Sequence, residues 1–166
     1  MSKLSPRLAS QNIRHHDYTH PDLHLPKFWR PKVTAAVKLD SQLAHWQMIT
    51  AFVEGKADAT TLQEWIDTGF TYSQMMHLLH ADGTEFTEAA EHALVDQLEI
   101  YDAVIKRHRA TGRIVFTGPE LAIARAAAEV MDALIQMDRH GIALKAAIWT
   151  TEQSARLAKR RQQGKL

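Results

Sequence analysis

Apolar positions recur every three to four residues from about residue 40 onward, which is the spacing of an amphipathic α-helix. Capping residues before these runs and glycines after them divide the pattern into five helices. Their expected ranges are 41–54, 60–68, 72–81, 85–111 and 118–160. The sequence therefore predicts an all-α fold, in which three short helices precede two long ones.

The two long helices are expected to form an antiparallel hairpin, because the connector between them is only a few residues long. Gly112 supplies the stop for the first of them. Thr117, Pro119 and Glu120 form the clearest helix start in the chain, since proline favours the first turn and glutamate completes a capping box.

The second helix of this hairpin carries a heptad-like apolar seam from Ile123 to Ala155. Gly141 interrupts it, but no capping residue follows and the seam keeps its phase. We therefore expect one long helix, bent at Gly141 and longer than its partner. Either the three short helices or a second copy of the chain must cover the apolar part that extends beyond the partner.

Residues 1–39 lack the helical pattern and are expected to form an extended, basic arm rich in proline and histidine, which leaves 40–166 as one helical domain. The arm is too apolar to be stable in water without a surface that receives it. Phe28, Trp29 and Arg30 are its strongest candidates for a partner contact, because aromatic and arginine side chains anchor interfaces. The alternative is that Phe28 and Trp29 fill a groove in the helical body of their own chain.

The net charge of +1 conceals a segregation of charge along the chain. Residues 1–40 carry a net +4, residues 41–105 a net −10 and residues 106–166 a net +7. This distribution favours a defined electrostatic contact. Near the C-terminus, four cations form a candidate nucleic-acid interface, for which a solvated helix end is the alternative: Arg156, Lys159, Arg160 and Arg161.

Residues 61–79 have the outline of a helix-turn-helix, with Gly69 near the turn. Trp65 stands where a tight helix crossing needs a small residue, and the surrounding segment is acidic, so it would repel phosphates. We therefore favour an ordinary pair of helices joined at Gly69.

Catalytic motifs are scarce in this sequence. The chain has no cysteine, which excludes disulfides, thiol nucleophiles and thiolate metal sites, and it has no phosphate-binding glycine loop. His77, His80 and Glu88 are weak candidates for metal ligands, because their spacing is unspecific and structural histidines are common. No cofactor is expected.

These observations favour a non-catalytic interaction or regulatory protein that acts through its arm and its long helix. We expect a cytoplasmic location, a protein partner and no membrane contact, since no long apolar segment or secretory signal occurs. Homodimer formation stays open. The alternatives are a nucleic-acid-binding regulator and, third, a metal-dependent helical enzyme.

Overall fold

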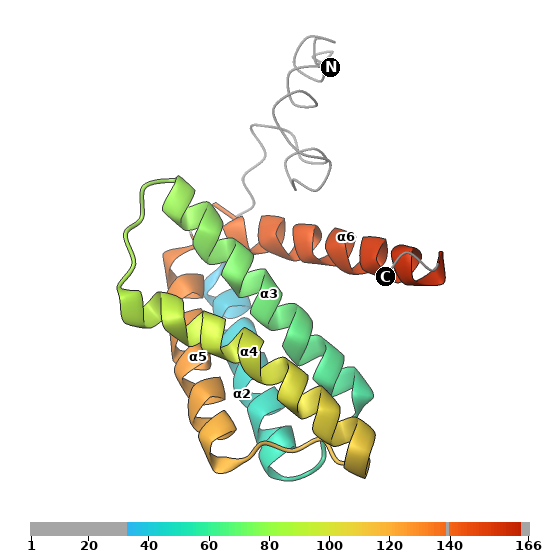
Figure 1. Cartoon of the computed structure of the whole chain (residues 1–166). Helices are drawn as coiled ribbons and strands as arrows, with labels where there is room; N and C mark the ends of the chain where they lie inside the picture. The colour runs from blue at the N-terminus through green and yellow to red at the C-terminus, as the bar shows by residue number, and fades with distance from the viewer. Residues whose placement is uncertain (1–32, 139, 164–166) are drawn as a thin grey trace.

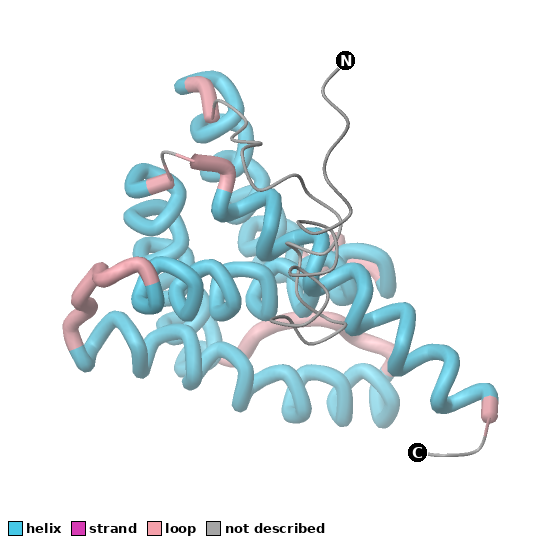
Figure 2. Tube along the Cα trace, turned by 90° about the horizontal axis from the view of Figure 1, so that it is seen from above, coloured by secondary structure: helices cyan, strands magenta, loops and turns pink. Residues whose placement is uncertain are grey.

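The protein is all-helical throughout the part that its computed structural model describes, residues 33–138 and 140–163. The helices in this part are α2 (Ala35–Val53), α3 (Ala59–Ala81), α4 (Glu88–Thr111), α5 (Gly118–Met137) and α6 (Ile142–Gln162). Figure 2 shows only helices and loops along these residues. The all-α prediction is confirmed, but several predicted boundaries are not.

Helix α2 begins at Ala35, six residues before the predicted start at 41. Thr34 is the N-cap, and its hydroxyl accepts a hydrogen bond from the backbone N–H of Val37 at 3.3 Å. Ser41, the first residue of the predicted range, lies within the helix and donates to the carbonyl of Val37. Residues 35–39, assigned to the arm, therefore belong to the helical body.

Helix α3 replaces the two short helices predicted at 60–68 and 72–81. Gly69 does not end a helix: it lies buried in the middle of α3 and lets the hydroxyl of Tyr101 approach the backbone. Thr71, directly before the predicted start at 72, caps no helix there and donates to the carbonyl of Asp67 one turn earlier. The helix-turn-helix and the helical pair are both contradicted, because there is no turn.

The predicted signals between α4 and α5 are confirmed. Gly112 ends α4 in a left-handed conformation, with φ of +71°. The carboxylate of Glu120 accepts from the backbone N–H of Thr117 at 2.7 Å, as a capping box requires. Arg107 joins the loop to both helices, because its guanidinium donates to Glu120 and to the carbonyl of Val115. The two helices pack against each other.

The single long helix predicted at 118–160 is in fact two helices, α5 and α6. Gly141 adopts a φ of +72°, which a continuing helix cannot accommodate. The capping residue comes before this glycine and not after it: the carboxylate of Asp138 accepts from the backbone N–H groups of Ile142 and Ala143. The heptad-like seam is therefore divided between two helices that run in different directions.

Helix α3 lies at the centre of the fold and packs against each of the other four described helices, most extensively against α6. Figures 1 and 2 show α6 turned away from α5, with its C-terminal part projecting from the bundle. One group of buried side chains contains the contacting rings of Phe52, Trp65 and Tyr101. A second group, which includes Tyr72 and Leu134, lies where α6 joins.

An apolar cleft between four helices

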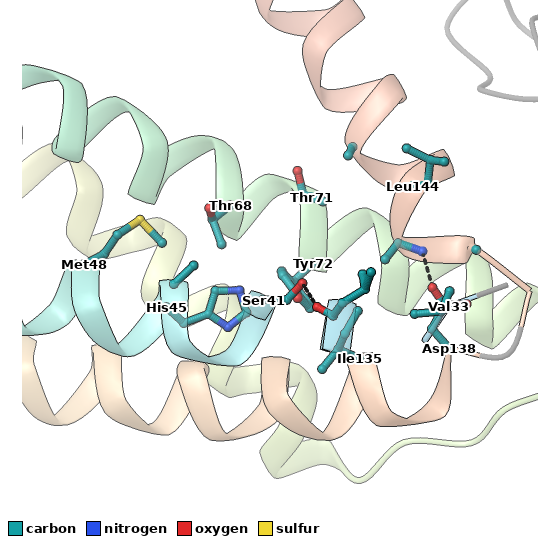
Figure 3. A pocket seen from close by; sticks show the side chains of 15 residues that line it. Val33, Ser41, His45, Met48, Thr68, Thr71, Tyr72, Ile135, Asp138 and Leu144 are labelled. Atoms are coloured by element: carbon teal, nitrogen blue, oxygen red, sulfur yellow. Dashed lines mark hydrogen bonds between the residues drawn. The ribbon is translucent and has the colours of Figure 1, made fainter. Parts of the chain in front are cut away.

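An open cleft of about 560 Å³ lies where α2, α3, α5 and α6 meet (Figure 3). We call it the apolar cleft, because most of its lining surface is apolar. The helices contribute Val37 and Ala44 from α2, Ile135 from α5, and Ala143, Leu144 and Ala147 from α6. Six polar side chains of the described residues also line it: Ser41, His45, Thr68, Thr71, Tyr72 and Asp138.

The break between α5 and α6 creates the cleft. Asp138 is 1% exposed, and its carboxylate accepts three backbone N–H groups, from His140, Ile142 and Ala143. These bonds fix the direction in which α6 leaves α5. A straight continuation would have carried Leu144 along the line of α5, whereas the turn brings it to the edge of the cleft, as Figure 3 shows.

His45 is the buried imidazole of the cleft and is 6% exposed. Its Nδ1 lies 3.7 Å from Oδ1 of Asp132, too far for a hydrogen bond, while Trp46 donates to the other carboxylate oxygen at 3.0 Å. Burial lowers the pKa of His45, and the nearby charge of Asp132 only partly offsets this effect. The imidazole is therefore held in its neutral form.

Tyr72 packs its ring against His45, with the ring centroids 4.8 Å apart and the planes nearly perpendicular. Burial raises the pKa of the Tyr72 phenol, and the charges of Asp132 and Asp138 raise it further. The phenol therefore stays protonated and can donate a hydrogen bond. His45 and Tyr72 give the apolar cleft two neutral polar groups that could orient a bound segment.

A second hollow, of about 550 Å³, continues the cleft along the groove between α2 and α3. The two share Ala44, Met48, Thr68 and Thr71. We call it the acidic hollow, because Glu64 and Asp67 line it. Asp67 also accepts a hydrogen bond from Ser154 of α6 at 3.1 Å. The groove therefore changes from apolar near the start of α2 to acidic further along that helix.

Ser41, His45 and Asp132 resemble the composition of a catalytic triad, but their geometry does not. The hydroxyl of Ser41 donates to the carbonyl of Val37 at 2.9 Å, so its proton is not directed at His45. The triad mechanism requires a hydrogen bond between the base and its orienting acid, and His45 and Asp132 do not form one. The arrangement therefore does not match a catalytic triad.

Among the described residues, none of the site candidates predicted from the sequence lines the apolar cleft. Phe28, Trp29 and Arg30 fall outside the described residues, so their role stays a prediction. Lys159 and Arg160 are exposed near the end of α6, Arg156 is half-buried, and the side chain of Arg161 is not described. Residues His77, His80 and Glu88 do not come together: among the described residues, no group of three histidine, aspartate or glutamate side chains could hold a metal ion.

Sequence reasoning missed the apolar cleft and its residues. His45 and Tyr72 occupy positions of helical periodicity that look like ordinary core, and Asp132 lies within a predicted helix. The one available signal was Asp138, an aspartate four residues before the start of a new apolar run, which is a standard helix-start residue. The apolar seam keeps its phase across Asp138, so the pattern favoured an unbroken helix at this position.

Comparisons of the chain with protein-family models, with curated proteins and with solved structures found no match. No helix among residues 33–138 and 140–163 is both long and apolar enough to cross a lipid bilayer. What the fold and the site define is therefore a class: a helical-bundle protein with an open apolar cleft continued by an acidic hollow.

The buried imidazole predicts a dependence of stability on pH. The pKa of His45 is lowered in the folded protein, so the unfolded chain binds more protons near and below the ordinary imidazole pKa of 6.5. We expect the free energy of unfolding to fall as the pH drops through that value. His45→Gln should flatten this dependence in urea titrations, and the exposed His77→Gln should not. Equal slopes for both variants would contradict the assignment.

Proposed function

We propose that the protein is a non-catalytic interaction protein that binds an apolar segment of a protein partner in the apolar cleft. The observation that carries this proposal is the open, aliphatic cleft at the junction of four helices. Concave apolar surfaces with a few polar groups are the usual form of a binding site. A regulatory role, a cytoplasmic location and homodimer formation stay predictions made from the sequence.

The edges of the cleft support this proposal. Val37 on α2 and Leu144 on α6 line the cleft, and they are 50% and 42% exposed. Large aliphatic side chains that face water around one concavity are uncommon unless another surface covers them. A partner segment with one or two apolar side chains would remove both from water, while His45 and Tyr72 could fix its orientation.

Nucleic-acid binding is the second candidate function, and it uses a different surface. The C-terminal part of α6 projects from the bundle in Figure 1, and it exposes Lys159 and Arg160. A projecting basic helix end can approach a phosphate backbone without a clash from the acidic middle of the chain. This candidate requires neither the apolar cleft nor its residues.

Affinity capture from the native host, with and without nuclease, tests both candidates. Ala147→Arg fills the cleft from α6, and Ala155→Arg is its matched control, because it makes the same change at an exposed position of the same helix. We expect the amount of captured partner protein to be unchanged by nuclease and by Ala155→Arg. Ala147→Arg should lower that amount at least about tenfold. Equal capture by the two variants would refute the cleft as the site. Capture that nuclease abolishes, and that Lys159→Ala with Arg160→Ala weakens, would support nucleic-acid binding instead.

A further inference from the structure

The N-terminal segment of the chain is attached at the edge of the apolar cleft. Val33, the first described residue, lines the cleft, and so does Val37 in the first turn of α2. Figure 3 shows Val33 and Leu144 on the same side of the cleft. The 32 residues before Val33 are therefore joined to the helical body at this concavity.

The segment before Val33 carries side chains that complement those of the groove. Phe28 and Trp29 supply two large apolar side chains, and Lys27 precedes them directly. A chain of this length reaches far enough: Trp29 lies four residues from Val33 and Lys27 lies six, which extended backbone spans as roughly 14 and 20 Å. Ala44, where the cleft meets the acidic hollow, is about 17 Å from Val33 along α2.

The aromatic pair and Lys27 also follow the order of the groove. Moving from Val33 along the groove, the lining is first mostly apolar and then acidic at Glu64 and Asp67. Moving backward along the chain from Val33, Lys32 and Arg30 come first, then the aromatic Trp29 and Phe28, and then Lys27. A segment that runs back along α2 would bring Phe28 and Trp29 to the apolar part and Lys27 to the acidic part.

We propose that Phe28 and Trp29 occupy the apolar cleft of their own chain, with Lys27 facing Glu64 and Asp67. A tether of a few residues gives the segment an effective concentration in the millimolar range at this site. A second copy of the chain would have to compete at its much lower bulk concentration. The occupant is therefore the same chain.

This contact regulates the proposed site, and to that extent it rests on the proposed function. A protein partner that binds in the cleft must first displace Phe28 and Trp29, so the segment acts as an intramolecular competitor. An apparent affinity falls in proportion to the fraction of molecules whose site is free. The free protein is then autoinhibited, and a partner that also binds the released segment would overcome the inhibition.

The absence of cysteine from the chain allows a direct test by disulfide trapping in the full-length protein. Leu25→Cys is combined with Thr68→Cys, which lines both the cleft and the acidic hollow. The matched control combines Leu25→Cys with Thr50→Cys, an exposed threonine of α2 that lines neither hollow and lies within about 26 Å of Val33, which the tether also reaches.

We expect the Thr68 pair to form an intramolecular disulfide about tenfold faster than the Thr50 pair. Adding Phe28→Ala and Trp29→Ala should remove most of that difference, although the tether is unchanged. Equal rates for the two pairs, or rates insensitive to the alanine changes, would overturn the proposal. A disulfide-linked dimer as the main product would also overturn it and would assign the cleft to a second copy.

Failure here is distinguishable from failure of the proposed function. The trapping experiment uses purified protein and no partner, whereas the capture experiment depends on Ala147→Arg and on a protein from the host. If trapping fails and capture depends on the cleft, the site binds a partner without internal competition. If trapping succeeds and capture is indifferent to Ala147→Arg, the segment is a fixed part of the fold and the partner site lies elsewhere.

Discussion

Gly69→Ala is expected to destabilise the protein by about 3 kcal/mol, against the usual gain of about 0.5–1 kcal/mol for this change within a helix. A Cβ at position 69 would overlap the hydroxyl of Tyr101 and would lie 2.9 Å from Nε2 of Gln97. Both side chains are buried, and the hydroxyl joins them to the carbonyl of Trp65. Urea unfolding followed by circular dichroism measures the loss.

Two further variants identify the cause of this loss. Gly118→Ala serves as the control, because an added Cβ meets nothing within 4 Å there, and we expect a change below about 0.5 kcal/mol. Tyr101→Phe removes the atom nearest to the new Cβ, so it should be less harmful in the Gly69→Ala background than in the wild type. A Gly69→Ala protein as stable as the wild type would show that α3 and α4 do not approach this closely.

Asp138→Ala is expected to cost about 3 kcal/mol of the free energy of unfolding and to release α6 from the bundle. The change leaves the backbone N–H groups of His140, Ile142 and Ala143 without the buried carboxylate that accepts from them, in a partly buried turn. Urea unfolding measures the stability, and limited proteolysis between α5 and α6 measures the release.

Asp138→Asn is the matched control for this change. An asparagine keeps one carbonyl oxygen as an acceptor and is itself a good N-cap, so a loss of only about 1 kcal/mol is expected. If the alanine variant lost less than about 1 kcal/mol and resisted protease as the wild type does, the cap would not determine the α5–α6 turn. The apolar cleft would then need another structural origin.

Local signals in the sequence predicted the class of the fold and several helix ends. The glycines that follow the predicted helical runs were expected to stop helices, and Gly55, Gly83 and Gly112 all adopt a positive φ. They could be predicted because a left-handed stop depends on a few adjacent residues. Gly69 resembled these glycines in the sequence, but its role is to let the side chain of Tyr101 approach the backbone of α3. Tyr101 is 32 residues away, and a local sequence pattern does not predict such a long-range contact.

The candidate site could not be predicted for a related reason. The apolar cleft exists because α6 turns at Asp138, and a seam with unbroken phase across residues 138–141 predicted the opposite. Periodicity shows which face of a helix is apolar, but it does not show whether the helix continues straight or is broken by a turn. Phe28 and Trp29 were predicted from the sequence as contact residues. The surface that we propose for them is formed by four helices, and the sequence did not predict how those helices are arranged.

Methyl NMR of the full-length Phe28→Ala, Trp29→Ala protein tests most directly whether the apolar cleft binds an apolar segment. The protein is titrated with a synthetic peptide that has the sequence of residues 25–32, up to about 1 mM. We predict saturable shifts of the Val37, Ile135 and Leu144 methyl signals, which line the cleft, and none at Val95 or Leu157, which are exposed elsewhere. Unchanged cleft signals, or equal shifts at Val95 and Leu157, would contradict the account.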